Sequence, residues 1–334
     1  MLLRLDNLAA GHSPGVPESG SHSGYKASRV LAWLLFGLLF SLWLARPALA
    51  GQTAMPLEYG LDIYNTRWAV SGSVFDCQFS QTIPGYGSAV FLQRAGEHVS
   101  FRLEATQNRM AYSDARVSLL PPPWRPAERT ENLGTVRIRQ ETPLLALDTR
   151  RSNQFIHGLL EGKRPTISHQ TWYDANRFVR VYVSGVTFQD YYPEFLDCIS
   201  RLLPMNYDQV ARSKVFFASG EDKIEKNDIK VLERVAYYIK HDPRVFALYL
   251  DGHSDSVGRR YDNRQVSKRR VEDVERYFVK QGIDPTMITT RFHGDRYPVA
   301  SNKTVKGRNE NRRVTIRLEM RDDMPIPDAL KFKP

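Results

Sequence analysis

The sequence predicts two domains: a mainly antiparallel β domain and, after it, an α/β domain with the element order βαβαββ. Between Leu57 and Asp197, turn residues such as Pro84-Gly85 separate short runs of β-branched and aromatic residues. After about Tyr207 the period changes, and apolar residues recur at helical spacing between strand-like runs. With 334 residues, the chain is long enough for each domain to have its own core.

Residues 1–50 are interpreted as a polar extension followed by a cleavable signal peptide. Lys26 and Arg29 precede the apolar run 30–45, and Ala48-x-Ala50 forms a small-x-small cleavage site before Gly51. The alternative is a transmembrane anchor, but the run is short for a hydrocarbon core of roughly 30 Å. We therefore expect an exported, periplasmic protein.

Residues 51–205 form the expected β domain. Its strand-like runs are "SAVFLQ", "HVSFRLEA", "RVSLL", "TVRIRQ" and "FVRVYVSGVTF", and "NQFIHGLLEGK" is expected to be one short helix. Cys77 and Cys198 are the two cysteines of the chain, and in an oxidising compartment such a lone pair usually forms a disulfide. Two separately buried thiols remain the alternative. A catalytic thiol is disfavoured because no histidine motif accompanies either cysteine.

Residues 206–322 form the expected α/β domain, and 323–334 a C-terminal tail. "SKVFFASG", "RVFALYL", "MITTRF" and "RRVTIRLEM" are strand-like. One helix is expected around 229–239, ending at Asp242-Pro243, and another from about Asp262 to Lys280, ending at Gln281-Gly282. This order implies a small mixed sheet with both helices packed on it.

The second helix carries polar residues where apolar ones would be expected. Asn263 and Arg270 fall on the same face as Val266 and Val274, and Asp255 follows the preceding strand. A guanidinium that faces a core is costly, so Arg270 is expected to need an anion. Arg270 and Asp255 either pair internally, or both contact a ligand with an anionic and a cationic end, such as an amino-acid head-group.

These residues lie in a recognisable pattern. "GHSDSVGRRYDNRQVSKRRV", with "HGDRYPVASNKTVKGRNENRRVTIRLE" after it, resembles the OmpA-type peptidoglycan-binding domain over roughly residues 213–319. The resemblance implies that Asp255 and Arg270 hold the free end of diaminopimelate in the peptide stem, and that Asn263 belongs to the site. Arg312 or Arg313 would add a further contact. Four mild departures remove no charged ligand group: Ser254, Val266, Val271 and Asp295.

The first domain carries a second resemblance. "YNTRWAVSGSVFDCQFSQTIPGYGSAVFLQRAGEHVSFRLEA" resembles the N-terminal domain of the MotY family of periplasmic flagellar motor proteins, and Cys198 also fits. This resemblance implies a part of the T ring on the outer-membrane side of the basal body. The N-terminal domain would join a MotX-type partner and the basal body, and the C-terminal domain would grip the wall. The ring would then support stator assembly and torque.

Other functions are less favoured. A zinc hydrolase built on His253/Asp255 and His293/Asp295 lacks a further ligand motif and a general base, so we expect no enzyme, no metal and no cofactor. A MotB-type stator subunit would need an acidic residue within 30–45, and there is none. The net charge of +10 comes with no nucleic-acid motif. The alternative that remains is a general OmpA-family wall anchor without a motor role.

Overall fold

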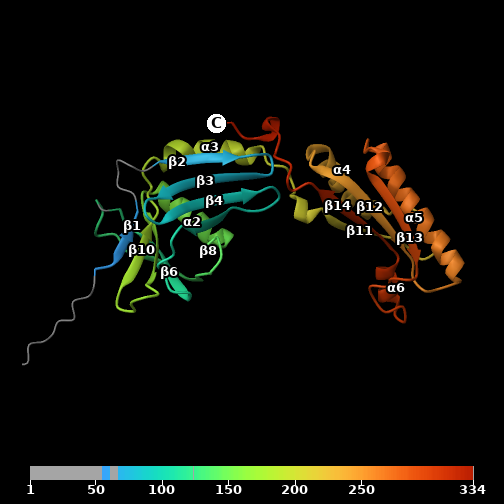
Figure 1. Cartoon of the computed structure of the whole chain (residues 1–334), viewed down its shortest axis with the longest axis horizontal. Coiled ribbons are helices and arrows are strands. Elements are labelled where there is room, and N and C mark those ends of the chain that lie inside the picture. Colours follow the sequence, from blue (N-terminus) through green and yellow to red (C-terminus); the bar gives the residue numbers. More distant parts are fainter. Residues whose placement is uncertain (1–54, 61–66, 123, 334) are drawn as a thin grey trace, which may run out of the picture. The chain divides into compact units, whose positions relative to one another are not determined.

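The computed structural model describes residues 55–60, 67–122 and 124–333 (Figure 1). The predicted extension and signal peptide at 1–50 lie outside the described residues. In the described part, the predicted fold class is confirmed: a β-rich N-terminal region precedes a C-terminal region in which helices pack on a sheet.

The N-terminal region contains two five-stranded sheets, with the strand orders β1-β10-β9-β6-β7 and β2-β3-β4-β5-β8. Their pairings are antiparallel except between β1 and β10. The strands are β1 (Leu57–Tyr59), β2 (Trp68–Gly72), β3 (Asp76–Ile83), β4 (Gly87–Arg94), β5 (Ser100–Ala105), β6 (Asp114–Leu120), β7 (Glu131–Arg137), β8 (Leu145–Leu147), β9 (Arg164–Gln170) and β10 (Phe178–Tyr182).

Two helices accompany these sheets. The expected short helix is α2 (Thr149–Leu160), which begins earlier than predicted because the Asp148 side chain accepts a hydrogen bond from the Arg151 backbone. The expected strand "FVRVYVSGVTF" is correct only as far as Tyr182, where β10 ends. Its last residue instead begins α3 (Phe188–Ser200), which contacts β2 and β3 (Figure 1). Helix propensity did not predict α3, because its aromatic residues favour strands and its internal Pro193 disfavours a helix.

The core of this region is aromatic, and it contains one reciprocally paired amide. Alternation along β3 buries Cys77, Phe79, Gln81 and Ile83. Gln81 Nε2 donates to the Ser184 carbonyl at 2.9 Å, while the Ser184 N–H donates back to Gln81 Oε1 at 2.9 Å. This reciprocal pair fixes the segment between β10 and α3 against β3 without leaving an unsatisfied buried amide.

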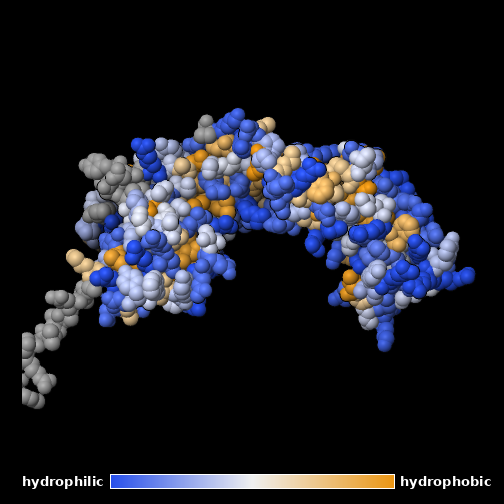
Figure 2. All heavy atoms as spheres, in the orientation of Figure 1, coloured by the Kyte–Doolittle hydropathy of each residue, from blue (hydrophilic) through white to orange (hydrophobic). Residues whose placement is uncertain are grey.

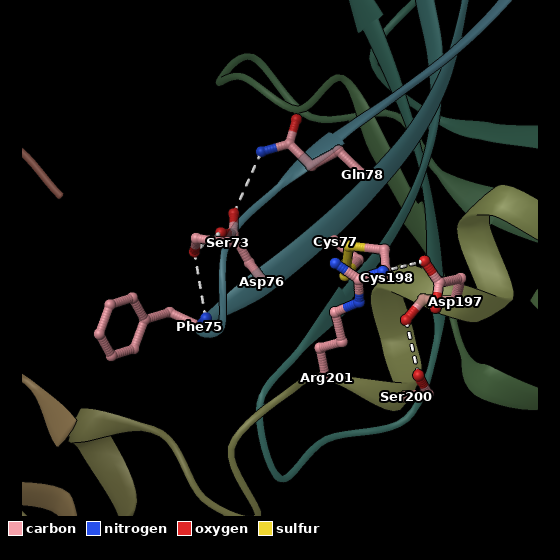
Figure 3. Close-up of a disulfide and its surroundings, with 9 residues drawn as sticks. All are labelled: Ser73, Phe75, Asp76, Cys77, Gln78, Asp197, Cys198, Ser200 and Arg201. Atoms are coloured by element: carbon pink, nitrogen blue, oxygen red, sulfur yellow. Dashed lines mark hydrogen bonds and ion pairs between the residues drawn. A yellow bond between two sulfur atoms is a disulfide. The ribbon is translucent and has the colours of Figure 1, made fainter. Parts of the chain in front are cut away.

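Cys77 in β3 is joined to Cys198 in α3 by a disulfide, as the sequence predicts, and Figure 3 shows the bond between strand and helix. Gly72 lies beside it, where a Cβ atom would come within 2.4 Å of the Asp76 carbonyl and 3.1 Å of Cys198 Sγ. Glycine therefore allows the β2–β3 turn to approach the bridge closely.

The C-terminal region has one four-stranded sheet in the order β11-β14-β12-β13, with α4 and α5 in contact with it. The structure adds a short helix, α6, that the expected order βαβαββ lacked, and α5 begins slightly before Asp262. The elements are β11 (Arg212–Phe216), α4 (Lys226–His241), β12 (Val245–His253), α5 (Arg260–Lys280), β13 (Ile288–Gly294), α6 (Val305–Asn311) and β14 (Arg313–Met320). Alternate residues Val314, Ile316 and Leu318 of β14 are buried, as expected.

Two residues of the expected C-terminal tail at 323–334 form backbone contacts with the end of β2 and the residue after it. The Phe332 N–H donates to the Gly72 carbonyl at 2.9 Å, and Lys331 forms an isolated bridge with Ser73. The face drawn in Figure 2 is mainly hydrophilic, with hydrophobic side chains scattered over it.

Candidate functional site

The site is built where α5 packs closely against β12. At Gly252 in β12, a Cβ atom would meet the Ser267 carbonyl at 2.4 Å and Val271 Cγ2 at 2.5 Å. Only glycine lets α5 approach the strand this closely, and the approach brings Arg270 beside the end of β12.

Arg270 is buried, with 1% of its surface exposed. Its Nε donates to the Glu221 carbonyl at 2.9 Å, and its two terminal nitrogens donate to the carbonyls of His253 at 3.2 Å and Ala218 at 3.3 Å. Burial, with a smaller effect from Arg312, lowers the pKa of Arg270 to about 10. Among the described residues Arg270 has no ion pair. The direct pair with Asp255, one of the two alternatives left open by the sequence, does not form, because three carbonyls satisfy the guanidinium instead.

Asp255 pairs with Arg312 instead. Asp255 Oδ2 accepts from Arg312 Nη1 at 2.8 Å, and both side chains are buried. Arg312 Nε also donates to the Phe217 carbonyl at 3.0 Å, and its other terminal nitrogen donates to Asn309 Oδ1. Arg270 and Arg312 thus both hold the segment 217–221 after β11.

The other two predicted residues are buried as well. Asn263 is 6% exposed, and its Nδ2 has no hydrogen-bond partner among the described residues. Arg313 donates to the carbonyls of Asn311 at 3.3 Å and Tyr297 at 3.2 Å, and burial lowers its pKa. The sequence did not decide between Arg312 and Arg313 as the further residue of the site. In the structure, Arg312 is the one that forms an ion pair with Asp255.

A pocket of about 560 Å³ opens beside this network. Of the predicted residues, only Arg312 lines it. Its lining comes from the end of β11 and the residues after it, from the N-cap of α4, and from α6 with the residue that follows it: Phe216, Phe217, Ala218, Ser219, Glu225, Lys306, Asn309, Glu310 and Arg312. The sequence did not predict most of these lining residues, because the seven residues of α6 are too few to show a helical period. Lys306, Asn309 and Glu310 nevertheless lie inside the motif "KGRNENRR".

The two histidines considered for zinc stack on each other, with ring centroids 5.1 Å apart. His293 Nε2 contacts Asp251 Oδ1 at 3.0 Å, and burial lowers the pKa of His253 to about 4. Within the part of the chain that the structure describes, no group of three or more His, Cys, Asp or Glu side chains could hold a metal ion. Across the same part, no helix is long and apolar enough to span a membrane.

Comparison with known proteins gives two family matches, the MotY N-terminal domain at residues 59–204 and the OmpA family at 216–312. The chain is 29% identical to the sodium-type flagellar protein MotY of Vibrio parahaemolyticus, over 86% of this chain and 97% of that protein. It is 36% identical to the peptidoglycan-binding protein ArfA of Mycobacterium bovis, over 32% of each chain. The solved peptidoglycan-associated lipoprotein of Burkholderia pseudomallei aligns at 22% identity and a TM-score of 0.31, covering 32% of this chain and 89% of that one.

Proposed function

Because the chain belongs to the family of proteins that join a MotY N-terminal domain to an OmpA-family domain, we propose that it is a non-enzymatic flagellar motor component anchored to peptidoglycan. The observation that carries this proposal is the similarity to the Vibrio MotY protein, which extends over 97% of that protein. A general wall anchor would account for residues 216–312 and would leave the N-terminal domain without a role.

In this proposal the C-terminal domain grips the wall through the free end of diaminopimelate in the peptide stem. Asp255, Asn263, Arg270, Arg312 and Arg313 form the recognition set. Arg312 lines the pocket, and Arg270 holds the segment after β11 in place. The buried, unpartnered amide of Asn263 supports a polar ligand near this network, because such groups are rarely left without a partner.

The N-terminal domain would join a MotX-type partner and the basal body, in a T ring on the outer-membrane side of the periplasm. A signal peptide at 1–50 would direct the chain there, and a disulfide such as Cys77–Cys198 suits an oxidising compartment. Several copies in a ring would turn weak stem contacts into a firm anchor, because each bound copy raises the effective concentration of the others. The fixed ring would then support stator assembly and torque.

An in-frame deletion, scored for both filaments and swimming, tests the motor role. We expect normal filaments with poor or no swimming, restored by the wild-type gene. An Arg270→Ala strain should also swim poorly, and its purified protein should sediment less with purified sacculi, whereas Arg269→Ala, which removes an exposed neighbour, should behave as wild type. Normal swimming of the deletion in a strain without a second copy of the gene would leave only the general wall anchor.

A further inference from the structure

The N-terminal region has a pocket of its own, of about 590 Å³, and none of the residues proposed to grip the wall lines it. Its lining comes from the loop before β7, from the end of α2 with the turn after it, and from the start of α3: Arg125, Glu128, Leu160, Glu161, Gly162, Lys163 and Gln189. This volume lies within the range of about 300–1,000 Å³ that is typical of small-molecule sites.

One side of this pocket is the turn that ends α2. Gly162 has a φ of 78°, and the Lys163 N–H donates to the Gly158 carbonyl at 2.8 Å, which is the usual glycine-dependent end of a helix. Gln189 Nε2, at the start of α3, donates to the Leu160 carbonyl at 2.7 Å. Backbone hydrogen bonds of two helices therefore hold this side of the pocket in place.

The charged residues of the lining neutralise one another. Arg125 forms an ion pair with Glu128 at 3.3 Å, and Lys163 forms one with Glu161 at 2.6 Å. Two cations and two carboxylates leave no net charge, so the pocket has no electrostatic preference for an ion. The carboxylates nevertheless keep lone pairs for further donors, and Gln189 Oε1 accepts no hydrogen bond from the described residues. These groups suit a neutral ligand that carries several hydroxyls.

An exposed tryptophan adds an aromatic surface beside the pocket. Trp124 is 64% exposed, and a Cβ atom at Gly162 would lie 3.6 Å from its Cζ2, so the indole lies next to the turn after α2. Trp172 is similarly exposed, at 63%, but its ring contacts Tyr173 and its Nε1 donates to the Asn108 carbonyl at 3.2 Å. Trp124 has no ring contact and no side-chain hydrogen bond within the described part of the chain. Its indole is therefore available to a ligand with an apolar face.

We propose that this pocket binds a neutral sugar ring. The C–H groups on one face of a pyranose pack on the indole of Trp124, and its hydroxyls exchange hydrogen bonds with Gln189, Glu128 and Glu161. A pyranose combines an apolar face with a rim of uncharged hydroxyls, which matches an aromatic surface beside a polar pocket of no net charge. Wall glycan strands and neutral glucans both present such rings. The site shares no residue with the proposed wall-recognition set, so neither proposal depends on the other.

The test uses the full mature chain and two tetrasaccharides of the same linkage, chitotetraose, which carries N-acetyl groups, and cellotetraose, which does not. Calorimetry measures Kd. Trp124→Ala should weaken binding about three- to ten-fold, as for the loss of an aromatic contact, and Gln189→Ala should weaken it about two- to ten-fold, as for the loss of a hydrogen bond. Because the ligand is neutral, the wild-type affinity should change by less than about two-fold between about 0.05 and 0.5 M salt.

The matched control is Trp172→Ala, which removes an equally exposed tryptophan outside the pocket and should bind as wild type does. Both tryptophan variants should fold normally, and urea denaturation checks this. A preference for chitotetraose would support a wall glycan strand as the source of the sugar, and equal or better binding of cellotetraose would support a neutral glucan. A wild type that binds neither sugar would overturn the inference, as would equal losses for Trp124→Ala and Trp172→Ala, or an affinity that falls steeply with salt.

Discussion

Asp255 and Arg312, 57 positions apart in the chain, form an ion pair at 2.8 Å with side chains only 8% and 9% exposed. The pair joins the end of β12 to the segment between α6 and β14, and Arg312 extends the connection to the Phe217 carbonyl. Arg312 thus holds together three segments, two of which line the pocket of the C-terminal region.

Removing one partner of this pair should be strongly destabilising. Arg312→Ala should lower the free energy of unfolding by about 3–5 kcal/mol, because Asp255 would remain as a buried charge without its partner. Urea denaturation measures the effect. The control is Arg317→Ala, which breaks an exposed pair with Glu319 and should cost about 1 kcal/mol or less. A similar cost for both variants would contradict a structural role for the buried pair.

Arg270→Lys should lower both stability and wall binding although the charge is kept. A single ammonium cannot reach the carbonyls of Ala218, Glu221 and His253 in the fork geometry of a guanidinium, so we expect a loss of about 2–4 kcal/mol. Urea denaturation and sedimentation with sacculi are the measurements. Arg269→Lys, at an exposed position, should stay within about 0.5 kcal/mol of wild type. If Arg270→Lys is as stable as wild type, the three hydrogen bonds of Arg270 contribute little to the free energy of unfolding.

Reduction of the disulfide should destabilise the N-terminal region. Cys77 and Cys198 are separated by 121 positions, and closing a loop of this size stabilises by about 4–5 kcal/mol in the chain-entropy model. Denaturation with and without a reductant measures the loss. The double variant Cys77→Ser/Cys198→Ser should resemble the reduced wild type and should not respond to the reductant. A wild type whose unfolding is indifferent to the reductant would contradict the prediction.

Stability should fall on mild acidification because of His253. Burial lowers its pKa from 6.5 to about 4, with further lowering by Arg313 and His293 and an opposing effect from Asp251. The unfolded chain therefore binds the proton more readily. The stabilisation that depends on neutral His253 is fully present above pH 6.5. The free energy of unfolding declines as pH falls below that value, and the whole loss, on the order of 3 kcal/mol, is reached below about pH 4.

The measurement is urea denaturation at pH 7 and pH 5. His253→Gln should lose less stability between these values than wild type, because it removes the titrating group. His241→Gln, which removes an exposed histidine, should keep the wild-type slope. Identical slopes for His253→Gln and wild type would rule out this residue as the source of the dependence.

Much of the fold followed from local patterns. Alternation identified β5 and β14, and helical spacing identified α4 and α5, because burial of one face imposes a period on the residues themselves. A run of consecutive apolar residues identified β4. Two of the helices described by the structure, α3 and α6, were not predicted from the sequence. In α3 the buried residues Phe188, Phe195 and Cys198 do follow a helical spacing, but strand-favouring aromatics and Pro193 obscure it. In α6 only seven residues are helical, too few for a period to be visible.

By itself, the sequence determined which residue types had to be explained: an arginine and an asparagine on an apolar helix face, an aspartate after a strand, and two arginines in one motif. Only the tertiary structure decided their partners. Arg270 meets three carbonyls from two segments, Asp255 meets Arg312, and the pocket of the C-terminal region takes its other charged residues from the N-cap of α4 and from α6. The physical reason is that periodicity reports which side of an element is buried, whereas hydrogen bonds and ion pairs depend on which distant segments the packing brings within about 3 Å of one another.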